Sequence, residues 1–215
     1  MSWLAIDTAT SRLSVAAGSS GADAVERHLD GPRQHARALL PLIDDALAAR
    51  AETLAALEAV VVADGPGSFT GLRVGAAVAK GLHDALRIPV YSAPSLLACA
   101  LARQEAGRVV ATSEALRGEV YAVLYEFADG QVRQLLAPHV MARDRVSEIA
   151  PGAVLLQDLA VDARRLLALR AWSGGLARIS QVEAWTPEYG RPAEAQARWE
   201  REHGRPLTHS SGLAG

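Results

Sequence analysis

Apolar stretches separated by polar turns predict a series of strands in the first hundred residues. The runs at 3–7, 13–18 and 57–64 are almost wholly apolar, which is typical of strands buried inside a sheet. Residues 23–29 alternate more weakly and predict a third strand beside the first two, and 88–93 predict another short strand. The first three strands would form a meander, and the later ones would extend the same structure.

Two long segments between these strands have apolar residues at helical spacing. One covers 34–50 and the other about 70–86, and a shorter helix is predicted at 94–104 with Pro94 at its start. Pro41 lies too deep in the first helix for a first-turn proline, so we expect it to remove one backbone hydrogen bond and to bend the helix. Strands interleaved with helices predict an α/β fold.

The second half repeats the layout of the first hairpin. Residues 108–130 read as a strand, a polar turn and a longer strand, after a charged segment, ARQEAG, that separates two apolar runs. This repeat predicts two related α/β lobes. We expect an N-terminal lobe at 1–103, a smaller C-terminal lobe at 104–203 and a frayed, polar tail at 204–215.

Composition and charge narrow the function classes. The 215 residues are 50% hydrophobic, enough for one large core or two small ones, and the formal net charge is -2. This balance argues against a chain that holds nucleic acid by itself, because phosphates need a surplus of Lys and Arg, so RNA would be reached through a partner.

The N-terminus lacks a signal-peptide pattern and no apolar run reaches the ~18 residues that span a bilayer, so we expect a cytoplasmic protein without membrane contact. Cys99 is the only cysteine, which excludes an internal disulfide and is more typical of a buried hydrophobe than of a nucleophile.

The stretch VVADGPGSFTGLRVGAAVAKGL at 61–82 leads from a strand through a glycine-rich turn into a helix. It lacks the Gly-Lys-Ser/Thr of a phosphate-binding P-loop and misses the dinucleotide pattern G-x-G-x-x-G by one residue. Pro66 also removes an N–H that would contact a phosphate. The helix N-terminus, with Ser68 or Thr70 as its cap, leaves anion binding open as an alternative. The stretch predicts a turn that starts a helix more strongly than a catalytic loop.

Small residues recur at every fourth position of this helix, at Gly71, Gly75 and Ala79, and would form a groove with almost no side chain. Because a mid-helix glycine costs up to ~1 kcal/mol relative to alanine, such a face indicates that another backbone comes close, either from a partner chain or from the same domain. The preceding helix is also apolar over a broader face than one sheet contact requires. The residues predicted for a partner-binding surface are Leu39, Leu42, Ala46, Gly71, Val74, Gly75, Val78 and Ala79.

Five segments together resemble a known family. They are LAIDTATSRLSVA, LLPLIDDAL, ADGPGSFTGLRVGAAVAKGL, IPVYSAPSLLA and RGEVYAVLYE, which lie in this order between about residues 3 and 127. They are similar to the TsaB family, also called YeaZ, the non-catalytic subunit of the bacterial complex that installs threonylcarbamoyl on an adenosine next to the tRNA anticodon. Glu114 and Leu116 depart from the Asp and Arg usual in the family, so no role is carried over to that loop.

The resemblance implies an actin-like, sugar-kinase-like (ASKHA) two-lobed fold with a reduced second lobe. It implies that the turn with Asp7, Thr8 and Thr10 is a vestigial nucleotide-binding loop, and that the two broad helices pack against the catalytic relative TsaD. It further implies the ATPase TsaE as a second partner, homodimers when TsaD is missing, and contact with tRNA only through the complex. ATP and a metal would belong to the partner subunits, and this chain would hold no cofactor.

Three functions compete at this point. The first is the scaffold subunit, which is not an enzyme and has no catalytic residue. The second is an autonomous ATP-dependent small-molecule kinase of the same fold, for which Asp7 is the one well-placed acid, although such an acid more often caps a turn. The third is a metallopeptidase, but the six histidines show no HxxxH or HxH spacing, so no metal site is predicted.

Overall fold

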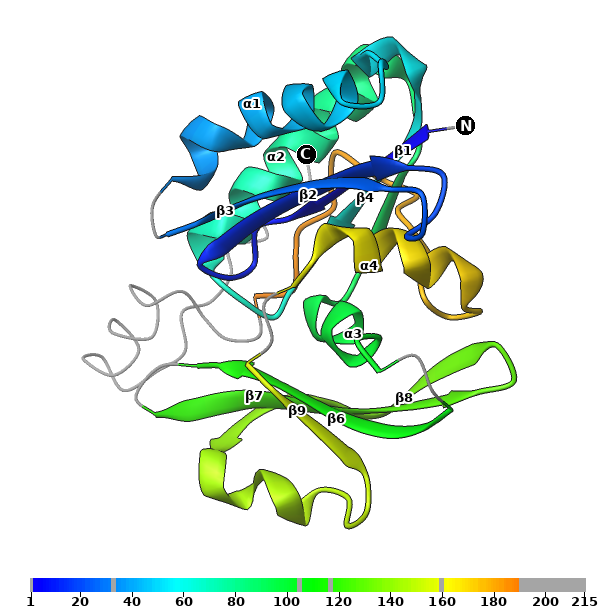
Figure 1. Cartoon of the computed structure of the whole chain (residues 1–215). Helices are drawn as coiled ribbons and strands as arrows, with labels where there is room; N and C mark the ends of the chain where they lie inside the picture. The colour runs from blue at the N-terminus through cyan, green and yellow to red at the C-terminus, as the bar shows by residue number, and fades with distance from the viewer. Residues whose placement is uncertain (1, 32–33, 104–105, 116–117, 159–160, 190–215) are drawn as a thin grey trace, which may run out of the picture.

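The computed structural model describes residues 2–31, 34–103, 106–115, 118–158 and 161–189. These residues form two β-sheets and four α-helices, arranged in layers (Figure 1). Two helices cover the outer face of the larger sheet, two shorter helices lie between the sheets, and the smaller sheet closes the other side. The chain is thus a mixed α/β protein, as the alternation of strands and helices predicts.

The larger sheet contains the predicted N-terminal meander. Its strands are β1 (Ser2–Asp7), β2 (Arg12–Gly18), β3 (Val25–Asp30), β4 (Leu57–Ala63), β5 (Val90–Ala93) and β10 (Ala177–Arg178). The first three strands pair in antiparallel fashion, while β4 lies parallel to β1 and β5 lies parallel to β4. The short β10 pairs antiparallel with β5 and completes the order β10-β5-β4-β1-β2-β3.

Helices α1 (His35–Ala48) and α2 (Phe69–Leu86) lie beside each other on the outer face of this sheet (Figure 1). Their apolar sides pack on buried residues of β1, β2 and β4. At the start of helix α2, the Ser68 hydroxyl oxygen accepts a hydrogen bond from the Gly71 N–H at 3.2 Å. Of the two predicted caps, Ser68 and Thr70, Ser68 is therefore the one that caps the helix. It ends at Arg87, whose φ of 57° is left-handed.

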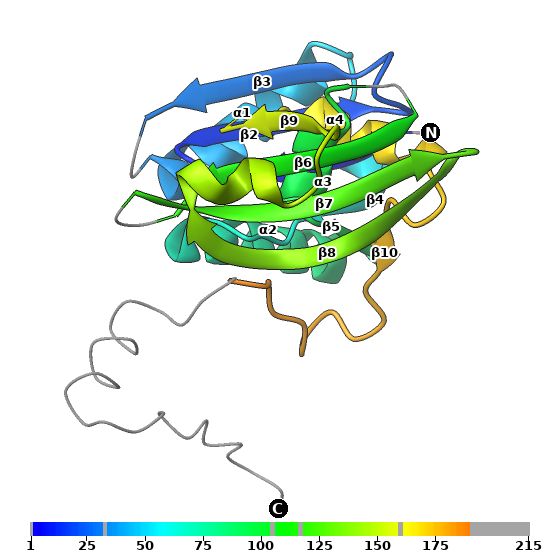
Figure 2. The same cartoon turned by 90° about the horizontal axis from the view of Figure 1, so that it is seen from below.

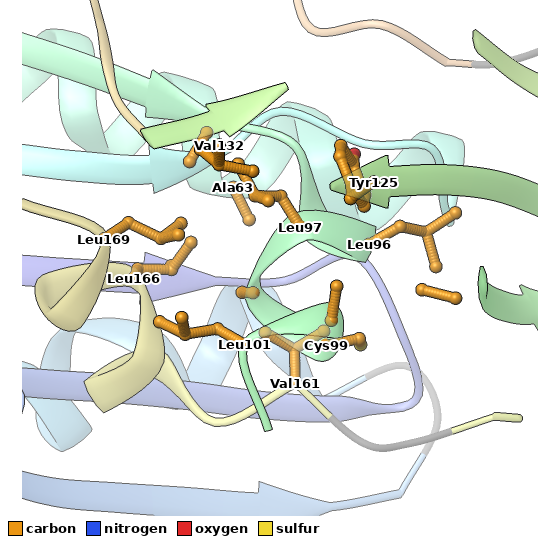
Figure 3. Packing of buried hydrophobic residues seen from close by; sticks show 14 of the residues in the cluster. Ala63, Leu96, Leu97, Cys99, Leu101, Tyr125, Val132, Val161, Leu166 and Leu169 are labelled. Atoms are coloured by element: carbon orange, nitrogen blue, oxygen red, sulfur yellow. The ribbon is translucent and has the colours of Figure 1, made fainter. Parts of the chain in front are cut away.

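Helices α3 (Ser95–Ala100) and α4 (Ala163–Ala168) lie between the two sheets and share one apolar core with both. Figure 3 shows Leu97 of α3 close to Leu166 of α4, with Tyr125 from the smaller sheet on the other side. All six residues of α3 are buried, as expected for a helix that is apolar on every side. This shared core joins the two sheets into one body.

The smaller sheet has the strand order β8-β7-β6-β9. Its strands are β6 (Gly107–Glu114), β7 (Glu119–Ala128), β8 (Gln131–Ala142) and β9 (Val154–Gln157). The hairpin of β6 and β7 is the one predicted at 108–130, β8 adds to it antiparallel, and β9 runs parallel to β6. Figure 2 views the molecule from this side and shows the 3-10 helix η2 (Arg143–Glu148) over the sheet, where Val146 is buried against Val110 and Leu124. Two shorter 3-10 turns are η1 (Leu54–Ala56) and η3 (Leu169–Ala171).

The prediction of a C-terminal lobe at 104–203 is wrong for residues 161–189, the last described part of that range. Helix α4 packs against β1 and β2, and β10 joins the larger sheet, so residues 161–189 return to the first lobe. The inner face of the larger sheet needs an apolar cover, and the segment around Leu166 supplies it. The smaller sheet is therefore inserted between two parts of the first lobe. The tail predicted at 204–215 lies outside the described residues.

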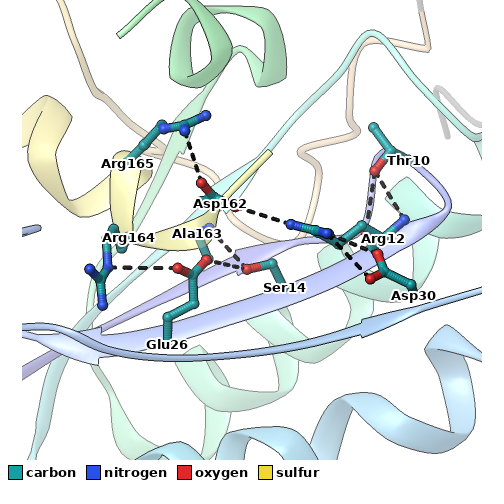
Figure 4. A network of polar contacts seen from close by, with 9 residues as sticks. All are labelled: Thr10, Arg12, Ser14, Glu26, Asp30, Asp162, Ala163, Arg164 and Arg165. Atoms are coloured by element: carbon teal, nitrogen blue, oxygen red, sulfur yellow. Dashed lines mark hydrogen bonds and ion pairs between the residues drawn. The ribbon is translucent and has the colours of Figure 1, made fainter. Parts of the chain in front are cut away.

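A network of polar contacts fixes α4 on the larger sheet (Figure 4). The Ser14 hydroxyl of β2 donates to Glu26 Oε1 at 2.7 Å and accepts the Ala163 N–H at 3.0 Å. The Arg12 guanidinium reaches Asp162, the residue before α4, at 3.4 Å. Because Ser14 is completely buried, its hydroxyl replaces water as the partner of both groups.

Candidate functional site

The glycine-rich turn between β4 and α2 is enclosed by backbone on two sides. On one side the Ser68 N–H donates to the Ala9 carbonyl at 2.7 Å, and a Cβ on Gly67 would overlap that same oxygen. On the other side Gly65 has a φ of +110°, and a Cβ there would overlap the Glu188 carbonyl oxygen. The glycines of this turn therefore permit it to pack closely against the first hairpin on one side and the C-terminal segment on the other.

The small-residue stripe of α2 faces the chain's own sheet. A Cβ on Gly71 would overlap the Thr8 carbonyl oxygen, and one on Gly75 would lie 2.5 Å from the Thr8 hydroxyl oxygen. Ala79 is also fully buried. The interpretation of these small residues as a groove for a partner helix is therefore wrong, and the backbone that comes close belongs to the same domain.

Two further residues predicted for the partner-binding surface lie in the interior. Leu39 and Ala46 of α1 have no exposed surface and belong to the core between this helix and the sheet. Leu39, Ile43 and Leu47 form the buried stripe of α1, which turns the neighbouring Leu40 outward. These buried residues position α1 on the sheet and do not face a partner.

The outward sides of α1 and α2 expose apolar groups. Leu40 is 54% exposed, and Phe69, the first residue of α2, is 36% exposed. Leu42, Val74 and Val78, three of the predicted partner-binding residues, are half-buried on the same two helices. We call these five residues the helix surface. Leu42, Val74 and Val78 also pack against the core beneath the two helices. A helix that packs on one sheet needs one apolar side, so the exposed parts of Leu40 and Phe69 are additional to what that contact requires.

The predicted nucleotide loop is a closed hairpin turn. Asp7 is fully buried, its Oδ1 accepts the Ala9 N–H at 2.9 Å, and its Oδ2 has no hydrogen-bond partner in the described chain. Burial raises the pKa of Asp7 to about 7, against the lowering effect of the Ala9 hydrogen bond. Thr8 is buried, and its hydroxyl has no hydrogen-bond partner among the described residues. The Thr10 hydroxyl accepts the Arg12 N–H at 3.2 Å. The side chains of Asp7 and Thr10 thus make local turn contacts.

The space between the two sheets is filled with side chains (Figure 3). Cys99 of α3 is buried there, and burial raises the pKa of its thiol to about 12, so the thiol stays neutral near pH 7. Tyr125 of β7 is buried as well, and its hydroxyl has no hydrogen-bond partner among the residues that the structure describes. A nucleotide site shared by the two lobes would have to lie in this packed region.

Metal chemistry has no candidate site in the described part of the chain. Within these ranges no group of three or more His, Cys, Asp or Glu side chains is placed to hold a metal ion. The metallopeptidase alternative therefore has no ligand set there. The helices found in the same ranges are also too short or too polar to cross a membrane.

Comparison with known proteins finds relatives in sequence and in structure. The family model described as TsaD, tRNA N6-adenosine threonylcarbamoyltransferase, matches residues 30–174. The solved structure of YeaZ from Pseudomonas aeruginosa superposes with a TM-score of 0.73 at 30% identity, over 87% of this chain and 99% of that chain. The tRNA threonylcarbamoyladenosine biosynthesis protein TsaB of Escherichia coli is 37% identical over 127 residues, which are 57% of this chain and 54% of that protein. The Bacillus subtilis protein of the same name is 29% identical over 66% of this chain and 73% of its own length.

The fold and these matches define a class, the two-sheet α/β proteins related to threonylcarbamoyltransferases. Within it, the chain belongs to the TsaB family, also called YeaZ. The resemblance carried by the five sequence segments is thereby confirmed. The chain spans about half the length of the Escherichia coli relative and nearly all of the Pseudomonas structure.

Proposed function

We propose that this chain is a non-catalytic subunit in tRNA threonylcarbamoyladenosine biosynthesis, and that its helix surface binds the transferase TsaD. The observation that carries the proposal is the apolar area on the outward sides of α1 and α2. Leu40 and Phe69 are exposed there, although both helices already bury another side on the sheet. The match to the transferase family over 30–174 supports a partner with equivalent helices, so that two related chains would pair like the halves of a helical bundle.

The same proposal assigns the chain an actin-like, two-lobed fold with a reduced second lobe. The two sheets with helices between them support this assignment. The turn with Asp7, Thr8 and Thr10 is then a remnant of a nucleotide loop that now serves packing. ATP and a metal would be held by the partner subunits, and tRNA would be reached only through the assembled complex.

Further partners follow from the same assignment. TsaE would join the complex of this chain with TsaD, and two copies of this chain would pair through the helix surface when TsaD is missing. On this assignment, the protein would act in the cytoplasm.

Co-expression with the TsaD of the same organism, followed by size exclusion, tests the proposal. Leu40→Glu places a charge on the helix surface and should weaken co-elution at least about tenfold, because a buried unpaired charge opposes association. Leu155→Glu is the matched control, since Leu155 is also exposed but lies on β9 of the smaller sheet. Undiminished co-elution of the Leu40 variant would contradict the assigned surface. ATP turnover of about 1 per second by the chain alone would favour the kinase alternative.

A further inference from the structure

A hollow lies where the two sheets and the C-terminal segment meet, beside the start of α2. Its volume is about 290 Å³, and it is lined by Pro66, Gln134, Ala137, Pro138, Glu188 and Tyr189. The lining combines the glycine-rich turn, the edge strand β8 and the last described residues. The hollow adjoins the helix surface, because the ring of Tyr189 packs on the ring of Phe69 with centroids 4.4 Å apart.

The hollow is negatively charged. Glu188 is its one charged lining residue, its side chain is exposed, and it forms no ion pair with any residue that the structure describes. A second carboxyl, that of Asp64, lies close by. Burial first, and the charge of Glu188 in addition, raise the pKa of Asp64 to about 6 against the hydrogen bond from Ser92. A cation placed here would relieve this repulsion.

The remaining walls suit the body of an arginine side chain. Pro66, Ala137 and Pro138 provide apolar contact for the methylene stem, and the Tyr189 ring offers a face for a cation. A guanidinium presents five N–H donors in a fixed plane, which match a carboxylate such as Glu188 and an amide oxygen such as that of Gln134. A lysine would use fewer of these features because its ammonium is a compact point charge.

We propose that this hollow receives an arginine side chain of the protein that covers the helix surface, with Glu188 as its carboxylate partner. The proposal rests on the proposed function for the identity of that protein, TsaD. The hollow would then set the orientation of the partner, while the helix surface supplies most of the apolar contact.

One experiment tests the hollow on the chain alone. N-acetyl-arginine methylamide is titrated to tens of millimolar, and the side-chain amide signal of Gln134 is followed by NMR. We expect a saturable shift that the neutral isostere N-acetyl-citrulline methylamide does not produce and that Glu188→Gln removes. Glu183→Gln is the matched control, because Glu183 is exposed on the same segment and does not line the hollow. Equal shifts with both compounds, or none with either, would overturn the proposal.

A second experiment measures the affinity of the same variants for TsaD. Glu188→Gln should weaken binding about tenfold, the size expected for the loss of one charge-assisted pair at an interface, and Glu188→Arg should weaken it further. The weakening should shrink at high salt, and Glu183→Gln should bind like the unchanged chain. Equal affinity of the Glu188 variants would overturn the proposal while leaving the helix surface in place. Absence of any TsaD binding by the unchanged chain would instead contradict the proposed function, and with it the partner assigned to the hollow.

Discussion

The two faces of the larger sheet are covered by helices in different ways. On the outer face, Leu4, Ile6 and Leu13 meet the apolar sides of α1 and α2 in a contact built from aliphatic groups. On the inner face the same strands present Asp7 and Ser14 to α3 and α4. Ser14 is fully hydrogen-bonded there, whereas Asp7 keeps one carboxyl oxygen without a partner in the described chain.

This difference separates residues that stabilise the fold from residues available for association, which the sequence pattern alone does not distinguish. Polar groups on the inner face are enclosed between the lobes, so changes there should alter stability. Leu40, on the outward side of α1, is more than half exposed, so a change there should alter association and leave stability almost unchanged. The following four predictions test this separation.

Asp7→Asn should have the largest effect, and its sign depends on pH. The fold raises the pKa of Asp7 from 3.8 to about 7, so it favours the protonated carboxyl. The contribution of this group to stability is full below about pH 4 and is lost as the pH rises to about 7. The variant should therefore be more stable than the unchanged protein at pH 8, by up to about 4 kcal/mol, and nearly equal at pH 4. Urea unfolding across this range checks it, and a difference independent of pH would contradict it.

Gly71→Ala should destabilise the chain by about 2–3 kcal/mol, because the added methyl group overlaps the Thr8 carbonyl oxygen and a backbone atom must move. Gly81→Ala is the same change in the same helix at a position with nothing within 4 Å. It should stabilise by about 0.5–1 kcal/mol through helix propensity. Thermal melts of the pair decide whether the stripe is interior. Equal melting temperatures would restore the interpretation of an open groove.

Ser14→Ala should cost about 1–2 kcal/mol, because it leaves the Glu26 carboxyl and the Ala163 N–H without their shared partner. Ser180→Ala, at an exposed position, should stay within about 0.5 kcal/mol. Denaturant midpoints of the two variants provide the comparison. A cost for Ser180 as large as that for Ser14 would show that the buried network does not hold α4 in place.

Leu40→Ala should have the smallest effect, a change in stability below about 0.5 kcal/mol, since more than half of this side chain is already in solvent at 54% exposure. Thermal melting checks this on the chain alone. A loss above about 1 kcal/mol would mean that Leu40 supports the fold and is not available to a partner.

Much of the first lobe is readable from the sequence. The strands at 3–7 and 57–64 are strongly apolar, and the two long helices have clear helical spacing, so pattern and structure agree. Strand β8 has no such pattern. It is an edge strand with Pro138 inside it, and Leu135 and Leu136 are both partly exposed, so neither alternation nor a continuous buried run marks it.

The sequence predicts only part of the candidate site. Helical spacing of apolar residues identifies Val74 and Val78, but that spacing does not tell which side of α2 meets the sheet. The spacing therefore assigns Gly71 and Gly75 to the wrong neighbour. It does not identify Phe69, which stands alone at the start of its helix, outside any periodic run. The hollow was out of reach, since its walls come from three distant segments of the chain.

The return of the chain to its first sheet affects how the protein can be made. As the chain leaves the ribosome, α4 and β10 emerge after the whole smaller sheet, so the N-terminal sheet stays incomplete during most of synthesis. A nascent chain that stops near residue 103 would leave Ala5 and Ala16 uncovered and the edge of β5 unpaired. Such exposed surface favours aggregation. The two sheets are therefore expected to reach their final structure together, as one late and cooperative event after residue 178 has been added.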